Sequence, residues 1–156
     1  MILYLDTSAL VKLYAVEEGR EAVEHAVEEA ELIVTSAVAY AEARATLARK
    51  HREGVFSEEE HSEAVAALDE DWRTLDVLSV TENVARFAGD LAEQHALRGF
   101  DAIHLASALL VRTAILGQSS GEADQEDVLF LGFDSDLVEA AARVMSVHGD
   151  APRDRE

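Results

Sequence analysis

The chain opens with the stretch Met1-Ile2-Leu3-Tyr4-Leu5-Asp6-Thr7-Ser8, in which an apolar run is followed at once by an acid and two hydroxyl residues. Residues 2–5 form a short apolar run that ends at a polar residue, which is typical of a buried strand. Residues 8–15, just after the acid, have the periodicity of a helix. A strand that leads into a helix in this way is the opening of an α/β fold.

The same alternation continues along the chain. Apolar runs at residues 32–34, 77–80 and 128–133 predict three more strands. Strands separated by helices favour an α/β fold with a mainly parallel central sheet flanked by helices. We expect one domain over residues 1–148, a flexible tail at 149–156 and a loop in the polar, acidic segment 117–127. Helical periodicity covers residues 20–29, 37–52, about 57–73, about 81–98, 101–116 and about 134–145.

Capping residues predict several helix boundaries. Ser57 and Glu60 have the spacing of a capping box. Thr81 and Asp134 are suited to cap the helices that follow them. Gly99 is expected to break the chain, so that a very apolar helix begins at Asp101.

Composition restricts the function and adds one difficulty. The 156 residues contain no cysteine, which excludes disulfides, thiolate catalysis and zinc–thiolate sites. No apolar run approaches the ~20 residues that span a membrane, and no basic start suggests a signal peptide, so we expect a soluble cytoplasmic protein. The 32 acids and 13 bases give a formal net charge of −19, whereas a nucleic-acid binder normally carries a basic patch. Such a surface repels phosphate unless cations or a partner neutralise it.

Four acids occupy positions where chemistry is expected. Asp6 and Asp134 each follow a predicted strand, and ligands of open α/β sheets bind beyond the carboxyl ends of the strands. Asp101 starts the most apolar predicted helix, and Glu42 lies among alanines early in another. Three of these acids also have an ordinary explanation, because Asp6 and Asp134 can be helix caps and Glu42 an exposed surface acid.

A cluster of four carboxylates needs a cation. Like charges at close range raise one another's pKa, so without a cation at least one carboxyl pKa should be raised. An all-oxygen ligand set suits Mg²⁺ or Mn²⁺. Two such ions about 3.5–4 Å apart can clamp the attacking and leaving oxygens of a phosphodiester.

Four motifs resemble those of the PIN-domain ribonucleases, especially the VapC-like toxins. They read LDTSALVKLY (residues 5–14), SAVAYAE (36–42), FDAIHLASAL (100–109) and FDSDL (133–137). The motifs occur in the order of the family, and the resemblance covers residues 2–144. Any one of them is a weak signal, whereas the ordered set is a strong one.

The resemblance implies that Asp6, Glu42, Asp101 and Asp134 are the catalytic acids and hold Mg²⁺ or Mn²⁺. Water activated there would attack an RNA phosphodiester and leave a 5′-phosphate and a 3′-hydroxyl. It also implies a homodimer and neutralisation by a small VapB-like antitoxin encoded alongside. Asp136 either assists as an additional acid or only favours a helix N-terminus.

Two features depart from the family pattern. Members often have Thr or Ser two residues before the fourth acid, where this chain has Gly132, so a hydroxyl that would steady the site is missing. The acidic segment 117–127 is longer than the usual connection.

Four further residues are candidates for substrate contact or support of the site. Ser8 can orient Asp6 or cap the first helix. His104 lies one turn after Asp101 and is either a ligand or proton-transfer group or a packed histidine. Arg44 and Arg98 can contact substrate phosphate or pair with neighbouring acids.

Two other functions remain open at this point. A phosphatase with a nucleophilic Asp6 usually has a second acid two residues on, where Ser8 stands here. A PIN-like interaction module would keep the fold without cutting RNA, and retention of all four acids argues against it.

Overall fold

The computed structural model describes residues 1–117 and 128–148. The expectations for the acidic segment beyond Gly117 and for the tail at 149–156 therefore lie outside the described residues.

The described chain is organised around a five-stranded sheet in which every pair of neighbouring strands is parallel. The strand order is β3-β2-β1-β4-β5, so the chain moves from the centre to one edge and then returns to the other side of β1. This confirms the α/β class. The strands are β1 (Ile2–Leu5), β2 (Leu32–Ser36), β3 (Asp76–Leu78), β4 (Val128–Leu131) and β5 (Val147–His148).

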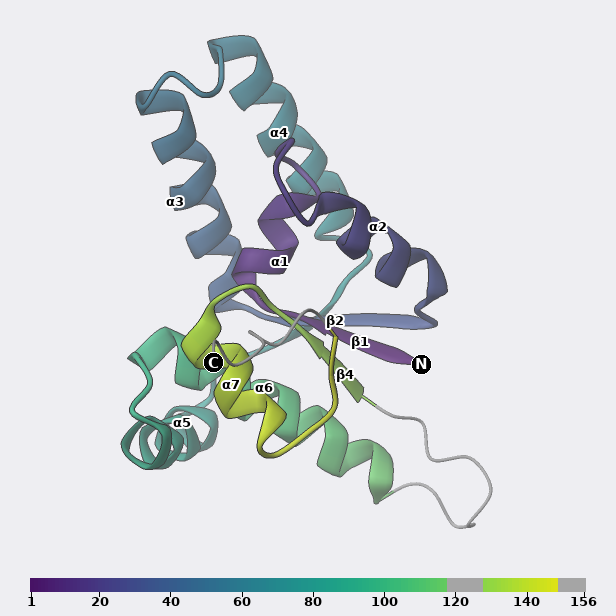
Figure 1. Ribbon diagram of the computed structural model, residues 1–156, viewed down its shortest axis with the longest axis vertical. Helices are drawn as coiled ribbons and strands as arrows, with labels where there is room; N and C mark the ends of the chain where they lie inside the picture. The colour runs from purple at the N-terminus through teal and green to yellow at the C-terminus, as the bar shows by residue number, and fades with distance from the viewer. Residues whose placement is uncertain (118–127, 149–156) are drawn as a thin grey trace, which may run out of the picture.

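Helices cover both faces of the sheet (Figure 1). On one face lie α1 (Thr7–Lys12), α2 (Arg20–Glu29), α3 (Val38–Arg52) and α4 (Glu58–Asp71). On the other lie α5 (Glu82–His95), α6 (Gly99–Leu116) and α7 (Ser135–Ala142). In Figure 1 the first group is above the sheet, with α3 and α4 projecting as a hairpin, and the second group is below it.

The two faces of β1 explain its continuous apolar run. Ile2 and Tyr4 pack into the core beneath α5–α7, whereas Leu3 and Leu5 pack into the core beneath α1–α4. Successive side chains of a strand point to opposite faces, so a central strand covered on both faces must be apolar throughout.

α6 is a core helix, although by length and composition alone it could cross a membrane. It packs against the sheet and against α5 and α7. Its middle, residues 102–109, is enclosed on several sides, which accounts for its apolar composition, whereas Leu110 and Leu116 nearer its end are exposed. Its buried residues are Ala102, His104, Leu105, Ala106, Ser107, Ala108 and Val111.

Most of the predicted caps are confirmed. The Ser57 hydroxyl and the Glu60 carboxylate form the expected capping box at the start of α4. Thr81 caps α5, and Asp134 caps α7 through Leu137 N.

The predicted start of α6 was wrong. The helix begins at Gly99, and the chain turns earlier, at Ala96, which adopts the left-handed conformation (φ 54°) that ends α5. Asp101 therefore lies in the first turn of α6 rather than at its first residue.

The strand ends also differ from those predicted. β2 continues two residues further, to Ser36, because Thr35 and Ser36 pair with β3. β3 begins one residue earlier and ends two residues earlier than predicted, and β5 was not predicted. β4 stops at Leu131, so Gly132 and Phe133 belong to the loop that leads to Asp134.

The strand order creates the position for a site. Connections leave β1 toward β2 on one side, whereas β4 pairs on the other side of β1. The carboxyl ends of β1 and β4 therefore form the topological switch point, where α/β sheets commonly bind ligands.

Candidate active site

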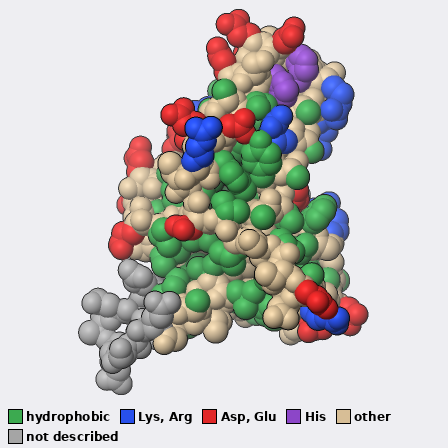
Figure 2. Space-filling view, turned by 180° about the vertical axis from the view of Figure 1, so that it is seen from behind, with side chains coloured by type: hydrophobic (Ala, Val, Ile, Leu, Met, Phe, Trp, Pro, Cys, Tyr) green, Lys and Arg blue, Asp and Glu red, His purple; other side chains and the backbone are tan. Residues whose placement is uncertain are grey.

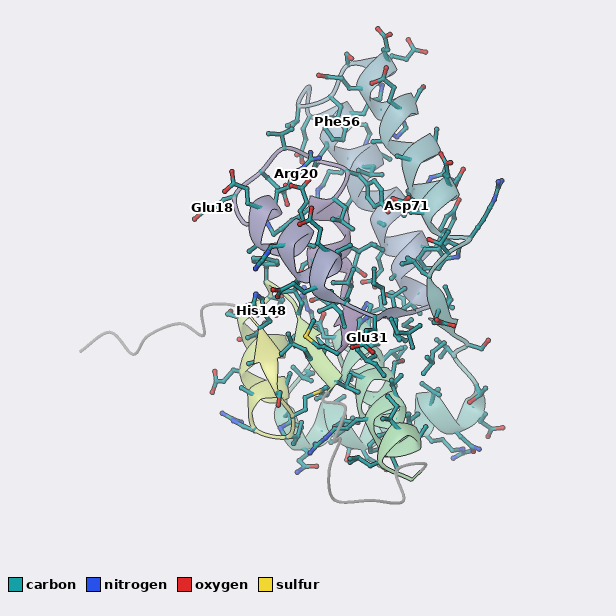
Figure 3. The ribbon with its side chains drawn as sticks, turned by 90° about the vertical axis from the view of Figure 1, so that its right-hand side faces the viewer. Glu18, Arg20, Glu31, Phe56, Asp71 and His148 are labelled. Atoms are coloured by element: carbon teal, nitrogen blue, oxygen red, sulfur yellow. The ribbon has the colours of Figure 1, made fainter. Side chains whose placement is uncertain are left out.

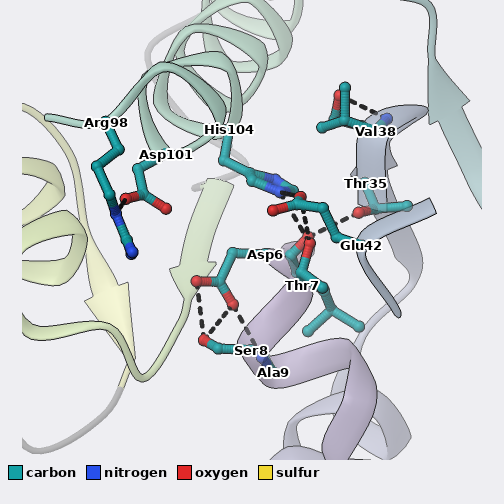
Figure 4. A network of polar contacts seen from close by, with 12 residues as sticks. Asp6, Thr7, Ser8, Ala9, Thr35, Val38, Glu42, Arg98, Asp101 and His104 are labelled. Atoms are coloured by element: carbon teal, nitrogen blue, oxygen red, sulfur yellow. Dashed lines mark hydrogen bonds and ion pairs between the residues drawn. The ribbon is translucent and has the colours of Figure 1, made fainter. Parts of the chain in front are cut away.

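All four predicted acids line one cleft at this switch point. The cleft has a volume of about 410 Å³, and Asp6, Glu42, Asp101 and Asp134 reach it from four separate parts of the chain. Figure 4 shows the first three from β1, α3 and α6 around a common space, with Arg98 at one side. The four acids, which are far apart in the sequence, therefore lie around one cleft as predicted.

Asp6 is held rigidly at the end of β1. Its backbone N donates to the Leu131 carbonyl of β4 at 3.1 Å, and its Oδ1 accepts from Ala9 N at 2.8 Å, so it caps α1. Ser8 Oγ lies 2.7 Å and 2.9 Å from the two carboxylate oxygens of Asp6, and it also accepts from Phe133 N at 2.8 Å. Of the two predicted roles for Ser8, orienting Asp6 is the one observed.

Gly132 leaves the space that the Asp6 carboxylate occupies. A Cβ on Gly132 would lie 2.6 Å from Asp6 Oδ2 and 2.9 Å from its carboxyl carbon. Gly132 thus does more than lack a hydroxyl, because its absent side chain permits this position of Asp6.

Glu42 is fixed by a partly buried network of hydrogen bonds (Figure 4). Thr7 Oγ1 donates to Glu42 Oε1 at 2.7 Å, and His104 Nε2 lies 2.8 Å from the same oxygen. His104 Nδ1 lies 3.0 Å from the Tyr4 hydroxyl. One protonation pattern satisfies both ring nitrogens: Nε2–H donates to Glu42 and Nδ1 accepts from Tyr4. The interpretation of Glu42 as an ordinary exposed acid is wrong, and His104 is a packed histidine that supports it.

Arg98 connects the other two acids. Its Nε donates to Asp101 Oδ2 at 2.9 Å, and its Nη2 donates to Asp134 Oδ2 at 3.0 Å. The Arg98 side chain is 79% exposed, so these pairs hold an arginine over the mouth of the cleft rather than inside it. Of the two predicted roles for Arg98, pairing with neighbouring acids is the one observed.

The predicted rise in a carboxyl pKa is found at Asp6. Burial raises the pKa of Asp6 from 3.8 to about 6, and the charge of Asp101 adds a smaller rise, against lowering by His104, Ser8 and Ala9 N. The cause is thus mainly loss of water rather than mutual repulsion of the acids. At Glu42, burial also favours a higher value, but hydrogen bonds from His104 and Thr7 hold its pKa below the ordinary value.

Two candidates do not reach the cleft. Asp136 is exposed in the first turn of α7 and lines a separate hollow between α5 and α7. Its position suits an acid at a helix N-terminus. Arg44 Nη1 donates to the Tyr40 hydroxyl at 2.7 Å, which in turn donates to Asp69.

Sequence reasoning missed several residues that line the cleft or support it from the core. Thr7 and Tyr4 flank Asp6 and could have been suspected from that position alone. Lys12, Arg49 and Lys50 also line the cleft, and no prediction singled them out as site residues.

The donor set suits a hard divalent cation, because every acid in the cleft offers carboxylate oxygen. Within residues 1–117 and 128–148, however, no three acidic or histidine side chains already lie as close as in a formed metal site. Arg98 neutralises Asp101 and Asp134 through its two ion pairs, whereas Asp6 and Glu42 have no arginine partner in the described residues. Metal binding at this site would therefore require side-chain rotation and release of Arg98.

Comparison with known proteins identifies the family of this chain. The model of the family described as PIN domain matches residues 3–118. Ribonuclease VapC45 of Mycobacterium tuberculosis is 38% identical over 110 residues, which make up 70% of this chain and 76% of that protein. FitAcB from Neisseria gonorrhoeae has a similar solved structure, with a TM-score of 0.64 at 19% identity over 96% of this chain and 97% of its own. M. tuberculosis VapC20, described as a sarcin–ricin loop cleaving toxin, has a TM-score of 0.63 at 16% identity, covering 92% and 95% of the two chains. The chain belongs to the PIN-domain family.

Proposed function

We propose that this protein is a Mg²⁺- or Mn²⁺-dependent endoribonuclease and the toxin of a toxin–antitoxin pair. The observation that carries the proposal is the convergence of Asp6, Glu42, Asp101 and Asp134 on one cleft at the switch point of a PIN fold. The name of the relative VapC45, a ribonuclease, supports RNA as the substrate.

The four acids would hold the metal. When bound, such an ion polarises a phosphodiester and lowers the pKa of water. Asp6 is the acid most in need of a cation, because it is 2% exposed and its contacts from Ser8 and Ala9 are hydrogen bonds without a full charge.

The neighbouring residues position these acids. Thr7 and His104 bind Oε1 of Glu42 and so direct its other oxygen, Oε2, toward the cleft. Ser8 holds Asp6 and, through Phe133 N, also fixes the loop that carries Asp134. These residues therefore set the geometry of three of the four acids.

A small VapB-like antitoxin is the expected partner. A similar solved structure, described as a toxin–antitoxin complex from Klebsiella pneumoniae, supports such a pairing. Arg98 supports a specific mode of inhibition, since its guanidinium fits between Asp101 and Asp134. An arginine of the antitoxin could occupy the same place and exclude the metal.

Two further expectations belong to this proposal, a homodimer and a cytoplasmic location. Hydrophobic side chains gather over the middle of the face seen in Figure 2, below the projecting α3–α4 hairpin. Large exposed apolar areas often mark contacts between proteins. Light scattering of the purified protein would test for the dimer.

Cleavage of single-stranded RNA tests the main proposal. We expect cutting with Mn²⁺, none with EDTA, and loss of most activity in Asp101→Asn, which removes charge with little change of shape. Asp90→Asn on the exposed surface of α5 is the matched control and should cut like the wild type. If Asp101→Asn cuts as fast as Asp90→Asn, the assigned site is wrong.

Two further assays separate the alternatives. A non-catalytic interaction module would leave RNA intact and bind Mn²⁺ weakly in calorimetry. A phosphatase with Asp6 as nucleophile would release phosphate from p-nitrophenyl phosphate, whereas the proposed nuclease would not.

A further inference from the structure

The acid cleft has a basic end. The chain has only two lysines, Lys12 and Lys50, and both line the same cleft as the four acids, as does Arg49. In a protein with a net charge of −19, placing both lysines in one cleft concentrates positive charge where the overall composition opposes it.

The two lysines clamp a single carboxylate. Lys12 Nζ donates to Glu17 Oε1 at 3.1 Å, and Lys50 Nζ donates to Glu17 Oε2 at 2.7 Å. One planar anion thus bridges two ammonium groups, with one oxygen for each. The lysines outweigh the effect of partial burial and hold the pKa of Glu17 below its ordinary value, so the carboxylate is ionised near neutral pH.

Both lysines are unusually well fixed for their residue type. Their side chains are 12% and 19% exposed. Lys12 Nζ also donates to the Glu18 carbonyl at 2.7 Å and lies 4.3 Å from the centre of the Phe133 ring. Figure 3 shows Glu18 itself projecting outward from this loop, so only its backbone takes part. Lysine heads normally remain in water, and held lysines form a preorganised site for an anion.

The basic end lies on the same helices as the acids. Lys12 ends α1, about 1.7 turns or about 9 Å beyond Asp6, which caps the start of that helix. On α3, the cleft residues Glu42, Thr46, Arg49 and Lys50 have the spacing of one helix face. A strand bound at the acids would therefore continue directly onto the lysines, since nucleic-acid charges follow one another every few ångströms.

We propose that Lys12 and Lys50 form a binding subsite for a backbone phosphate of the RNA next to the scissile bond, and that Glu17 occupies this subsite in the free protein. This inference rests on the proposed ribonuclease function. A phosphodiester offers two non-bridging oxygens that share one negative charge, as the Glu17 carboxylate does, and lysine binds phosphate as a point charge. Arg49, at the same end of the cleft, would contact the next phosphate.

Glu17 is consequently a competitor of the substrate. An RNA strand must displace the Glu17 carboxylate from both ammonium groups. The free energy lost with each displaced contact reduces the free energy gained from the new contact with phosphate. Removing the charge of Glu17 should therefore tighten RNA binding, whereas removing the charge of either lysine should weaken it. If the cluster only stabilises the fold, the Glu17 and lysine substitutions should not have opposite effects on RNA binding.

The test measures binding of a fluorescein-labelled single-stranded RNA by anisotropy, in EDTA and at low salt, with the probe checked for intactness. Lys12→Gln and Lys50→Gln should each weaken binding about tenfold, the effect of losing one charge-assisted contact. Each should also reduce the slope of log affinity against log salt by about 0.7. Glu17→Gln should tighten binding several-fold. Arg86→Gln and Glu93→Gln, on the exposed surface of α5, are controls of matched charge and should change binding little.

The outcomes are distinct. Unchanged or weaker RNA binding by Glu17→Gln, lysine variants that match Arg86→Gln, or no RNA binding by the wild type would each overturn the subsite. If a lysine variant fails to fold, the charge-preserving Lys50→Arg and Glu17→Gln decide the matter. Weaker RNA binding by the lysine variants and tighter binding by Glu17→Gln, without RNA cleavage in Mn²⁺, would support the subsite and reject the nuclease. Cleavage without these binding effects would reject the subsite alone.

Discussion

Asp6→Asn tests the electrostatics of the cleft most directly. Burial holds the pKa of Asp6 at about 6, compared with an ordinary value of 3.8. Each tenfold change in proton affinity corresponds to about 1.36 kcal/mol, so ionising this carboxyl costs the folded state about 3 kcal/mol relative to the unfolded chain. Asparagine has nearly the same shape, carries no charge and keeps an oxygen that can accept from Ala9 N.

The pH dependence follows from the raised pKa. Between 3.8 and about 6, the folded protein binds more protons at Asp6 than the unfolded chain does, so this group makes stability fall as pH rises. The penalty is absent below this range and complete above it. Without metal, Asp6→Asn should therefore be more stable than the wild type by up to about 3 kcal/mol near pH 8, with little difference near pH 4.

Urea unfolding in EDTA at about pH 4, 6 and 8 would measure both free energies of unfolding. Asp90→Asn serves again as the control, because it removes an equivalent charge from the exposed surface of α5. The reasoning fails if the wild type is as stable as Asp6→Asn near pH 8, or if the difference between them does not change with pH. Asp101→Asn should stabilise less than Asp6→Asn, since Asp101 already pairs with Arg98.

Mn²⁺ should make the wild type more stable than Asp6→Asn. An ion that binds only the folded state adds about 2.7 kcal/mol at a hundredfold excess over its Kd. The wild type should gain this stability, whereas Asp6→Asn, which lacks one of the proposed ligands, should gain much less. Equal gains in the two proteins would mean that Asp6 only caps α1.

Three other substitutions have expected outcomes. Arg98→Gln should increase Mn²⁺ affinity several-fold in calorimetry, because it removes the guanidinium that competes for two of the acids; unchanged affinity would contradict this. Gly132→Ala should lower the rate of RNA cleavage more than it lowers the melting temperature, because its Cβ would meet the Asp6 carboxylate at 2.6 Å. Ala96→Gly should raise the free energy of unfolding by about 1 kcal/mol, because alanine is strained at φ 54° and glycine is not; a loss of stability in urea titrations would show that the Ala96 methyl packs usefully.

The sequence predicted the parts of the fold that local rules determine. α2 was predicted at the bounds observed, and the Ser57–Glu60 capping box was confirmed, because both depend on neighbouring residues. The start of α6 was wrong because glycine was taken as the breaker, whereas α5 ends at Ala96 in a left-handed C-cap, where Leu97 N donates to the Ala92 carbonyl at 3.1 Å. β4 was predicted too long because Phe133 is apolar, although it serves as a platform for Lys12 and contacts Gly19 rather than the sheet core.

The acids were predictable, whereas their partners were not. Each acid belongs to a local motif, but the contacts of Arg98 with Asp134 and of His104 with Tyr4 join segments far apart in the sequence. The pairing of Lys12 and Lys50 with Glu17 could not be predicted for the same reason. Only the helical spacing from Glu42 to Lys50 gave a local indication of that end of the cleft. This spacing does not show that the helix face lines a cleft until the fold is known.

The net charge of −19 does not govern what an RNA strand meets in the cleft. At physiological ionic strength, charges further away than about 8 Å are largely screened, so the many acids on exposed helix surfaces contribute little there. The strand instead meets two local regions, the lysines at one end and the four carboxylates at the other. The carboxylates repel phosphate until a cation is bound, so metal and RNA should each increase the affinity of the other by the same factor. A chain with this arrangement would keep a strongly acidic surface and still bind RNA, because a metal bound at the acid end would supply there the positive charge that Lys12 and Lys50 carry at the other.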